Sequence, residues 1–429
     1  MSPYANDNEG WLEEAILEVK DFLWELEAGK PLIEIKEEED SVKQFSSDRI
    51  IPAYSKAKGL IYGKRVVVEP HCIINGSIIG REAVLIGQHV KITQSVLSCG
   101  LIELENSEVG NIYAPTIRFR APINVAGDIV AKSNLIIPPG SRVKNIYCLG
   151  DSLELPERCS IDNVICKGAI TFKPNTEVKG VAKAQAITLS PRCSVNALFV
   201  KSDLKIPPEC KLNEIYSAKS VLIEGYANIS KLFAEGDVEV NNSVIGKIAC
   251  NNLLVFGETK VKKVYANNKV VIDQKCKEFT CECIVSNNDV IIPSNSHVKV
   301  VICSHNLTVG NNCTIDYIMA RNITAGDRLR SKFVKAMGTI TLGNDCKVGL
   351  LQAIGNITVG ERFKSDRWSI FSEKGAIKTT GPVILKGRSI FAPEHLIEYN
   401  MSKILTALIS KKDFELLQRI SSKTKVKVN

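Results

Sequence analysis

The side chains that most often carry out catalysis or bind metals are histidine and cysteine, and both occur here. The five histidines are His71, His89, His297, His305 and His395. His71 and His89 stand one repeat of the pattern described below apart, so they could form a pair. We interpret each histidine as structural or exposed, with catalysis or metal binding as the alternative.

The fourteen cysteines do not have the spacing of a metal site, because no Cys-x-x-Cys motif occurs and the only close pair is Cys281 and Cys283. Most of the others share one of two phases of the repeat. The first phase holds Cys148, Cys166, Cys250 and Cys303, and the second holds Cys72, Cys159, Cys193, Cys210, Cys276 and Cys313. At such positions cysteine acts as a small buried hydrophobe. We expect reduced thiols, including the adjacent-coil pairs Cys148/Cys166 and Cys193/Cys210, and a reducing compartment.

Other motifs that carry chemistry are missing from the sequence. There is no phosphate-binding Gly-x-x-x-x-Gly-Lys-Ser/Thr loop, no Gly-x-Ser-x-Gly elbow and no His-Glu-x-x-His helix. Carboxylates do not recur in facing columns as in sugar-cleaving β-helices, and we find no Thr-x-Thr ladder. We therefore expect a protein that is not an enzyme, with no catalytic, cofactor-binding or metal-binding residues and no cofactor.

One frame recurs along most of the chain and predicts the elements that hold these residues. An apolar residue, any residue and a small residue are followed by three mostly polar residues, an apolar–x–apolar triplet and, about five residues later, another Val or Ile. Four consecutive copies are Ile146-Tyr147-Cys148 with Leu153 and Leu155, Val164-Ile165-Cys166 with Ile170 and Phe172, Val181-Ala182-Lys183 with Ile187 and Leu189, and Leu198-Phe199-Val200 with Leu204 and Ile206. Lys183 and Val200 break the rule of a small third residue. About nineteen copies begin between residues 61 and 371, most of them 17 residues apart.

This period predicts the fold. It is too short for helical or leucine-rich repeats, whereas short apolar triplets suit one coil of two or three strands. We expect an all-β protein, a parallel β-helix (β-solenoid) of about 19 coils of ~17 residues over residues 59–392, roughly 90 Å long at ~4.8 Å per coil. Pro138-Pro139-Gly140, Pro156 and Pro207-Pro208 mark corners between strands.

The two ends are expected to be helical. Residues 1–58 form an acidic helix over 8–28, ended by Gly29-Lys30-Pro31, and a linker. Residues 393–429 form a helical cap with a basic tail of Lys423, Lys425 and Lys427. Two roles remain open for both ends, namely covering the exposed edges of the solenoid or binding partners.

Charge and composition indicate the partners. Residues 1–50 carry a net charge of −9, which leaves +17 for the rest of a chain whose total is +8. A positive body can attract nucleic acid or anionic lipid. We interpret it as a solvated lysine-rich surface and do not expect nucleic-acid binding, while the basic tail suits a membrane surface. No segment reaches the ~20 apolar residues that span a bilayer and no secretory signal is seen, so we expect a cytoplasmic protein.

The coil resembles that of a known family. Copies such as Ile129-Val130-Ala131 with Leu135, Ile136, Ile137 and Val143, and Leu232-Phe233-Ala234 with Val238, Glu239 and Val240, resemble the bactofilins, polymer-forming cytoskeletal proteins with a β-helix of short coils. The resemblance covers residues 61 to about 387 and implies a non-enzymatic structural scaffold or filament-forming protein. Its partners would be itself, end to end, or other proteins through the terminal helices. The alternative function is that of a hexapeptide-type acyltransferase or another ligand-binding β-solenoid enzyme.

Overall fold

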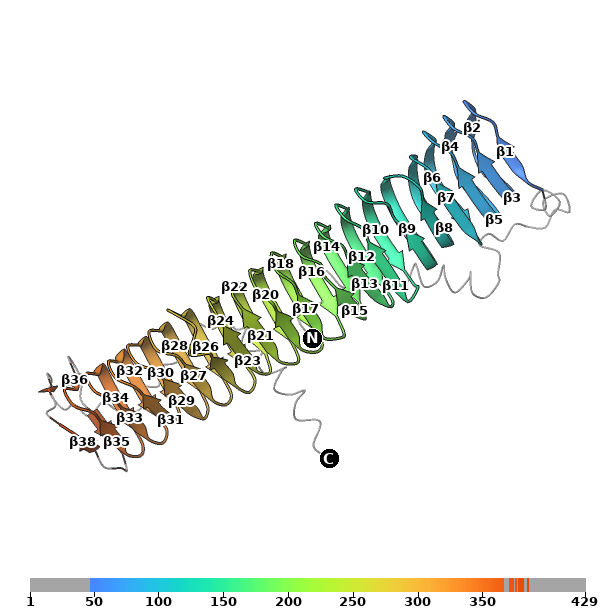
Figure 1. Ribbon diagram of the computed structural model, residues 1–429. Coiled ribbons are helices and arrows are strands. Elements are labelled where there is room, and N and C mark those ends of the chain that lie inside the picture. Colours follow the sequence, from blue (N-terminus) through green and yellow to red (C-terminus); the bar gives the residue numbers. More distant parts are fainter. Residues whose placement is uncertain (1–46, 366–369, 374, 376, 382–383, 386–429) are drawn as a thin grey trace, which may run out of the picture. The chain divides into compact units, whose positions relative to one another are not determined.

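The computed structural model describes residues 47–365, 370–373, 375, 377–381 and 384–385. These residues form the expected all-β parallel β-solenoid of about 19 turns and contain no helix. Figure 1 shows the short strands stacked coil upon coil. The chain divides after Gly150 into two compact units. The helices expected at residues 8–28 and 393–429 lie outside the described residues.

Unit 1 contains ten strands, which pair only in parallel among the described residues. They are β1 (Arg49–Ile51), β2 (Lys56–Lys58), β3 (Ile61–Val68), β4 (Ile73–Asn75), β5 (Ile78–Ile86), β6 (Lys91–Ser98), β7 (Leu101–Leu104), β8 (Glu108–Phe119), β9 (Asn124–Ile136) and β10 (Arg142–Cys148). β1 and β2 precede residue 59, where the sequence placed the start of the solenoid. The described coils therefore begin about ten residues earlier, within the segment interpreted as a linker.

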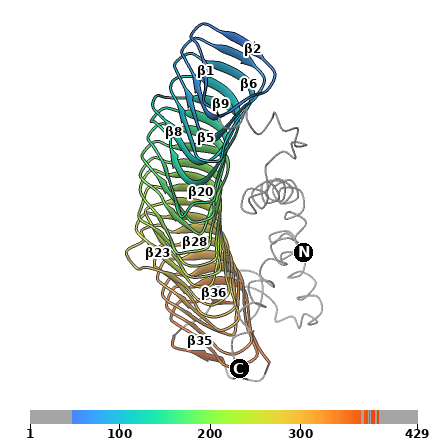
Figure 2. The same cartoon turned by 90° about the vertical axis from the view of Figure 1, so that its right-hand side faces the viewer.

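Unit 2 has two kinds of strand that alternate along the chain (Figure 2). The longer strands, together with the last short ones, form the face that we call sheet A. The longer strands are β12 (Ser160–Cys166), β14 (Glu177–Ala184), β16 (Ser194–Val200), β18 (Lys211–Ser217), β20 (Asn228–Ala234), β22 (Val244–Cys250), β24 (Lys260–Ala266), β26 (Thr280–Ser286), β28 (His297–Cys303), β30 (Thr314–Ala320), β32 (Arg330–Ala336) and β34 (Lys347–Ala353). The short ones are β36 (Lys364–Ser365), β37 (Ile370–Ser372) and β39 (Ile384–Leu385).

The shorter strands of unit 2 form two further sheets. Sheet B contains β11 (Ser152–Leu155), β13 (Ala169–Phe172) and β15 (Ala186–Thr188). Sheet C contains β17 (Leu204–Ile206), β19 (Val221–Ile223), β21 (Val238–Asn241), β23 (Leu253–Phe256), β25 (Val270–Ile272), β27 (Val290–Ile292), β29 (Asn306–Val309), β31 (Asn322–Ala325), β33 (Ile340–Leu342), β35 (Ile357–Val359) and β38 (Ile377–Thr379).

The core consists of columns of like side chains. Parallel pairing joins Ile215 to Leu232, Leu232 to Ile248 and Ile248 to Val264, and each of these four side chains is 0% exposed. Side chains alternate between the two faces of a strand. A constant register between coils therefore places the first and third residues of each copy of the repeat in the core. Ile187, assigned inward from the sequence, is 5% exposed. This confirms the inward assignment of Ile187 on β15.

The frame shifts by one residue at β14. The sequence placed Val181 inward and Lys183 at the small position, but the buried residues are Ala182 and Ala184. The register between β12 and β14 shifts before Val164, where Val181 donates its backbone N–H to Oδ1 of Asn163 at 2.9 Å. Gly180 allows this close approach, since a Cβ there would lie 2.2 Å from the same oxygen. The rule of a small third residue therefore holds in this coil, with Ala184 in place of Lys183.

One corner of most coils is made by a single residue in the left-handed region. Sixteen non-glycine residues have φ between 39° and 65°. They are Tyr54, His71, His89, Asn106, Arg158, Asn175, Arg192, Glu209, Tyr226, Asn242, Glu278, Asn295, Asn312, Arg328, Asp345 and Arg362. We call this set the corner column. A left-handed residue reverses the direction of the chain within two residues, and the residue after it turns inward.

The cysteine phases match this geometry. Cys72, Cys159, Cys193, Cys210 and Cys313 each follow a corner-column residue directly, and all five are buried. The first-phase cysteines Cys148, Cys166, Cys250 and Cys303 are buried as well. All fourteen cysteines are free thiols, and Cys99 alone is exposed. The interpretation of both phases as small core positions is therefore confirmed.

Candidate interaction surfaces

Sheet A carries a column of aromatic rings on its outer side. Phe199, Tyr216 and Phe233 occupy the middle position of the triplet on β16, β18 and β20, and parallel pairing aligns them. The Phe199 and Tyr216 rings stack with centroids 4.7 Å apart, and the Tyr216 and Phe233 rings with centroids 5.1 Å apart. Stacked rings at coil spacing form a rigid apolar strip with a low entropic cost of binding. The arrangement suits contact with another apolar surface.

A lysine column runs beside these rings. Register aligns Lys231 with Lys247 and Lys247 with Lys263. The Nζ of Lys247 lies 5.5 Å from the centroid of Phe233 and 5.3 Å from that of Tyr265, which places the ammonium between two ring faces. Burial, followed by the positive charges of Lys263 and Lys231, lowers the pKa of Lys247 to about 8. Lys231 also meets the Glu214 carboxylate at 2.6 Å.

The outer side of sheet A is more deeply buried at the following coils. Tyr265 continues the aromatic column and is 1% exposed, while Ala249 between Phe233 and Tyr265 is 0% exposed. Cys283 and Val300, which continue the lysine column, are 0% and 2% exposed. Phe233 and Tyr216 remain partly exposed although each has a neighbour on both sides. Stacking within the column therefore does not by itself bury an outward ring completely.

The corner column also carries stacked and paired side chains. In unit 1, the Tyr54 and His71 rings stack at 5.0 Å, and the His71 and His89 rings at 5.1 Å. His71 and His89, which the sequence places one coil apart, thus stack as exposed rings. In unit 2, Nε of Arg192 donates to Oε2 of Glu209 at 2.7 Å. Left-handed residues on successive coils therefore place their side chains in contact.

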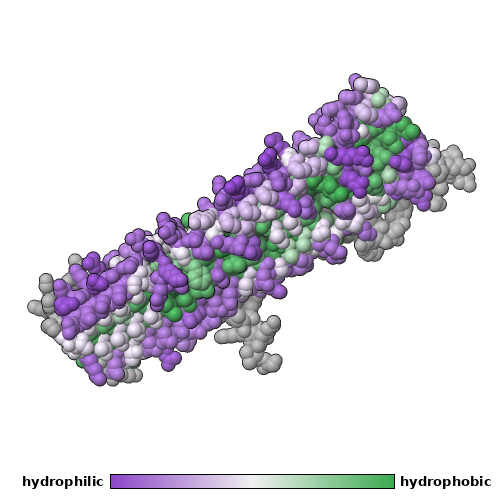
Figure 3. Space-filling model, viewed as in Figure 1, coloured by the Kyte–Doolittle hydropathy of each residue, from purple (hydrophilic) through white to green (hydrophobic). Residues whose placement is uncertain are grey.

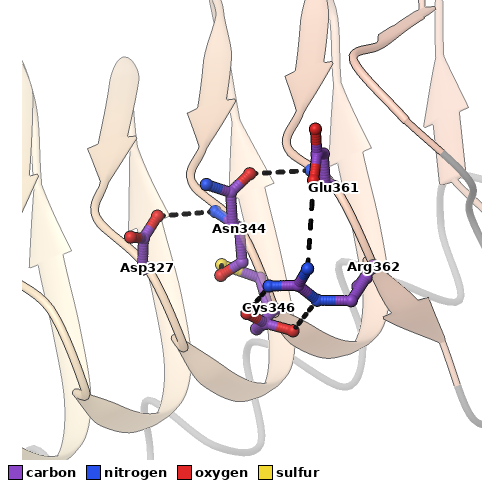
Figure 4. Close-up of polar contacts among 6 residues, drawn as sticks. Asp327, Asn344, Cys346, Glu361 and Arg362 are labelled. Carbon is purple, nitrogen blue, oxygen red and sulfur yellow. Dashed lines mark hydrogen bonds and ion pairs between the residues drawn. The ribbon is translucent and has the colours of Figure 1, made fainter.

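Polar ladders run beside the corners. In the ladder shown in Figure 4, each side-chain oxygen accepts a backbone N–H from the next coil. Asp327 accepts from Asn344 at 2.7 Å, and Asn344 accepts from Glu361 at 2.9 Å. A second ladder on the other side of the coil joins Asp203, Ser220, Asp237, Asn252 and Lys269. These residues satisfy backbone donors that the corners leave outside the sheets. We interpret them as structural.

Sheet C has outward columns of its own. Thr308, Thr324, Thr341 and Thr358 align on four successive coils. This single threonine column was not found in the sequence, where a Thr-x-Thr ladder was sought. On the earlier strands β17 to β25 of the same sheet, a shallow depression of about 600 Å³ is lined partly by Lys205, Leu222, Glu239, Leu254 and Val271. On the face shown in Figure 3, apolar residues form a broken band between polar ones.

The buried thiols of Cys250, Cys281, Cys283 and Cys303 are unsuited to nucleophilic chemistry. Burial raises the pKa of Cys283 to about 11 and that of Cys303 to about 12, and it also raises the pKa of Cys250 and Cys281. The thiolate is the reactive form, so these side chains are protonated at neutral pH. No group of three or more His, Cys, Asp or Glu side chains that could hold a metal occurs within the described residues.

Two histidines in unit 2 lie on the surface. His297 and His305 are exposed, and Nδ1 of His305 lies 3.3 Å from the carbonyl oxygen of Asn287. His395 lies outside the described part of the chain. Across the described ranges, no helix has the length and apolar character needed to cross a bilayer.

In comparisons with known proteins, no family model, no curated protein and no solved structure matches the chain.

Proposed function

We propose that this protein is a non-enzymatic structural scaffold of the cytoplasm, which assembles into filaments end to end and acts through protein–protein contacts, in the manner of the bactofilins that its coil resembles. The observation that carries the proposal is the stacked column of Phe199, Tyr216 and Phe233. Partly exposed rings held in a row on the outer side of a sheet are typical of a surface that binds other proteins.

The first strand supports end-to-end assembly. β1 pairs with β3, and among the described residues it has no other strand partner. A parallel strand carries N–H and C=O groups on both sides, so the other side of β1 can pair with a strand from a second molecule. The same stacking that joins coils within the chain can in this way join copies of the chain.

The interior supports a structural role. Its inward columns consist of Ile, Val and Leu side chains, among them Ile215, Leu232 and Val264, each 0% exposed. The buried cysteines share the interior as packing residues, and burial raises the pKa of Cys210 and Cys283 to about 11. We therefore expect partners to bind the outward-facing columns and the terminal segments. We propose that other proteins bind the helices expected at residues 8–28 and 393–429, and that the basic tail binds a membrane surface.

Two measurements on the purified full-length chain test this proposal. Negative-stain electron microscopy over a range of concentrations is expected to show filaments that lengthen with concentration. An acetyl-CoA binding assay by calorimetry is expected to show no heat of binding. Particles of single-chain size at every concentration, together with saturable acetyl-CoA binding, would instead support the acyltransferase alternative.

A further inference from the structure

The last coils of unit 2 carry a cluster of cations at one corner. We define the basic corner as Arg328, Arg330, Lys347, Arg362 and Lys364, all of which are exposed. Register aligns Arg330 with Lys347 and Lys347 with Lys364, on β32, β34 and β36. Arg328 and Arg362 belong to the corner column and stand two residues before Arg330 and Lys364. The five cations therefore lie on three successive coils, about 4.8 Å apart along the stack.

Acidic neighbours offset only part of this charge. The hydrogen bond from Arg362 lowers the pKa of Asp345, and the positive charges of Arg362, Arg328 and Lys364 lower it further. One carboxylate therefore faces three cations. Arg362 also has a longer contact with Glu361 at 3.9 Å. Within the described residues, no salt bridge joins Arg328, Arg330 or Lys364 to a carboxylate. The basic corner therefore keeps an exposed positive excess.

The chain contains a run of carboxylates that complements this corner. Residues 37–40 are Glu-Glu-Glu-Asp, and no other four consecutive residues of the sequence are all acidic. A run of carboxylates can meet several cations at once, and such a network of exposed ion pairs is more favourable than isolated pairs. The seven residue steps from Asp40 to Ser47, the first described residue, span at most about 25 Å.

End-to-end assembly brings the two charged sites together. β36 pairs with β34 and with β39, so Arg330 on β32 is three coil steps from β39, about 14 Å at ~4.8 Å per coil. Ser47 directly precedes β1, in the first described coil. When the first coil of one molecule stacks near the last coils of another, the reach of about 25 Å from Ser47 covers the basic corner.

We propose that residues 37–40 of a second copy bind the basic corner, with their carboxylates against Arg328, Arg330 and Lys364. The inference rests on the proposed end-to-end assembly and adds its direction. Opposite charges favour the contact of a first coil with a last coil, whereas two basic corners or two acidic runs repel each other. The charges thus select head-to-tail order.

Carbodiimide cross-linking of the full-length protein tests the contact. Unlabelled and heavy-isotope-labelled chains are mixed in equal amounts in high salt, transferred to low salt and cross-linked. The reagent joins carboxylates to lysines, so it can link residues 37–40 to Lys347 or Lys364. We expect mass spectrometry to find peptide pairs at these sites that combine one light and one heavy chain. Pairs within one isotope only would place the segment on its own molecule and overturn the proposal, as would the absence of any pair.

Arginine does not react with the reagent, so the corner can be reversed in charge with every lysine left in place. Arg328→Glu with Arg330→Glu should lower the yield of mixed pairs several-fold. The left-handed corner accepts glutamate, which occupies it at Glu209. Arg158→Glu with Arg142→Glu is the matched control, in the corner column and at the start of β10, and should leave the yield unchanged. Equal yields from the two variants would contradict the proposal.

A rescue variant and microscopy complete the test. Adding Glu38→Arg and Glu39→Arg to the reversed corner should restore the mixed pairs through Glu37 and Asp40, a result that a damaged fold would not give. Filaments of the parent protein without mixed pairs would overturn this inference and leave the scaffold proposal standing. Mixed pairs without filaments would retain the contact between copies and contradict filament formation alone.

Discussion

Asp345 and Arg362 occupy the same corner on consecutive coils, and the guanidinium of Arg362 binds both carboxylate oxygens of Asp345. Nε donates to Oδ1 and Nη2 donates to Oδ2, each at 2.6 Å. Both residues are left-handed, with φ of 56° and 54°. The repeated backbone conformation therefore brings the two side chains into bidentate geometry, the strongest form of this ion pair.

The Asp345–Arg362 pair predicts a pH dependence. The hydrogen bond from Arg362 lowers the pKa of Asp345 in the folded protein. The stabilisation is therefore present above the unfolded value of about 3.9 and is lost as the pH falls through the folded value. Asp345→Asn, which tolerates the left-handed backbone, should melt slightly below the parent at pH 7. Melting curves should converge at acid pH, and a difference that persists there would contradict the assignment.

Substitution of Ile187 tests the inward frame. Ile187→Asp places an unpaired carboxylate in a site that is 5% exposed, a change that costs several kcal/mol. Thr188→Asp, at the exposed neighbouring position of β15, is the matched control and should cost within about 0.5 kcal/mol. Urea unfolding followed by circular dichroism measures both. Because coils couple to their neighbours, hydrogen exchange should show the loss of protection beginning at β13 and β15. Equal midpoints for the two variants would place Ile187 outside the core.

Thiol labelling tests the state of the cysteines. Among the fourteen, Cys99 is exposed and the others are buried. A thiol-specific reagent should modify Cys99 rapidly in the native protein and all fourteen cysteines after denaturation without a reductant. Mass spectrometry of the alkylated protein gives the sites. Cys193 and Cys210 lie on adjacent coils, so a stable native disulfide between them is the result that would contradict reduced packing thiols.

The lowered pKa of Lys247 predicts a second pH dependence of stability. Its cause is the burial of a cation, whereas that of Asp345 is an ion pair. The folded Lys247 pKa of about 8 lies below the ordinary 10.5, so between these values the unfolded chain binds more protons and stability rises with pH. The gain should be seen as the difference between the parent and Lys247→Gln, in which other titrations cancel. Urea midpoints at pH 7, 9 and 10 provide the measurement. A difference that stays flat over this range would show that Lys247 is not desolvated between Phe233 and Tyr265.

Much of the fold followed from the sequence because inward positions tolerate few residue types. Ile215, Leu232 and Ile248 recur at one phase, and the cysteines share phases that the structure buries. The shift at Gly180 was missed because a one-residue bulge leaves the apolar residue Val181 in the expected place. Its signal is local, namely a glycine opposite Asn163, and depends on the pairing of two strands.

The outer surfaces were harder to predict. The frame allows any residue at the middle position of the triplet, so it did not predict that Phe199, Tyr216 and Phe233 form a column. Only the register shows that they form one stack. The polar ladder of Asp327 and Asn344 was missed for the same reason, since its hydrogen bonds join residues 17 apart in the chain. Alignment of the copies by phase would have revealed both columns.

The most direct test of the scaffold proposal is light scattering of the full-length protein against concentration and salt, beside a chain that lacks residues 1–45. The acidic N-terminal segment and the C-terminal segment, with seven basic and four acidic residues, predict attraction between copies that salt screens over ~8–10 Å. The account predicts particles that grow with concentration, shrink in high salt and remain monomeric after truncation. A monomer in both samples, indifferent to salt and concentration, would contradict it.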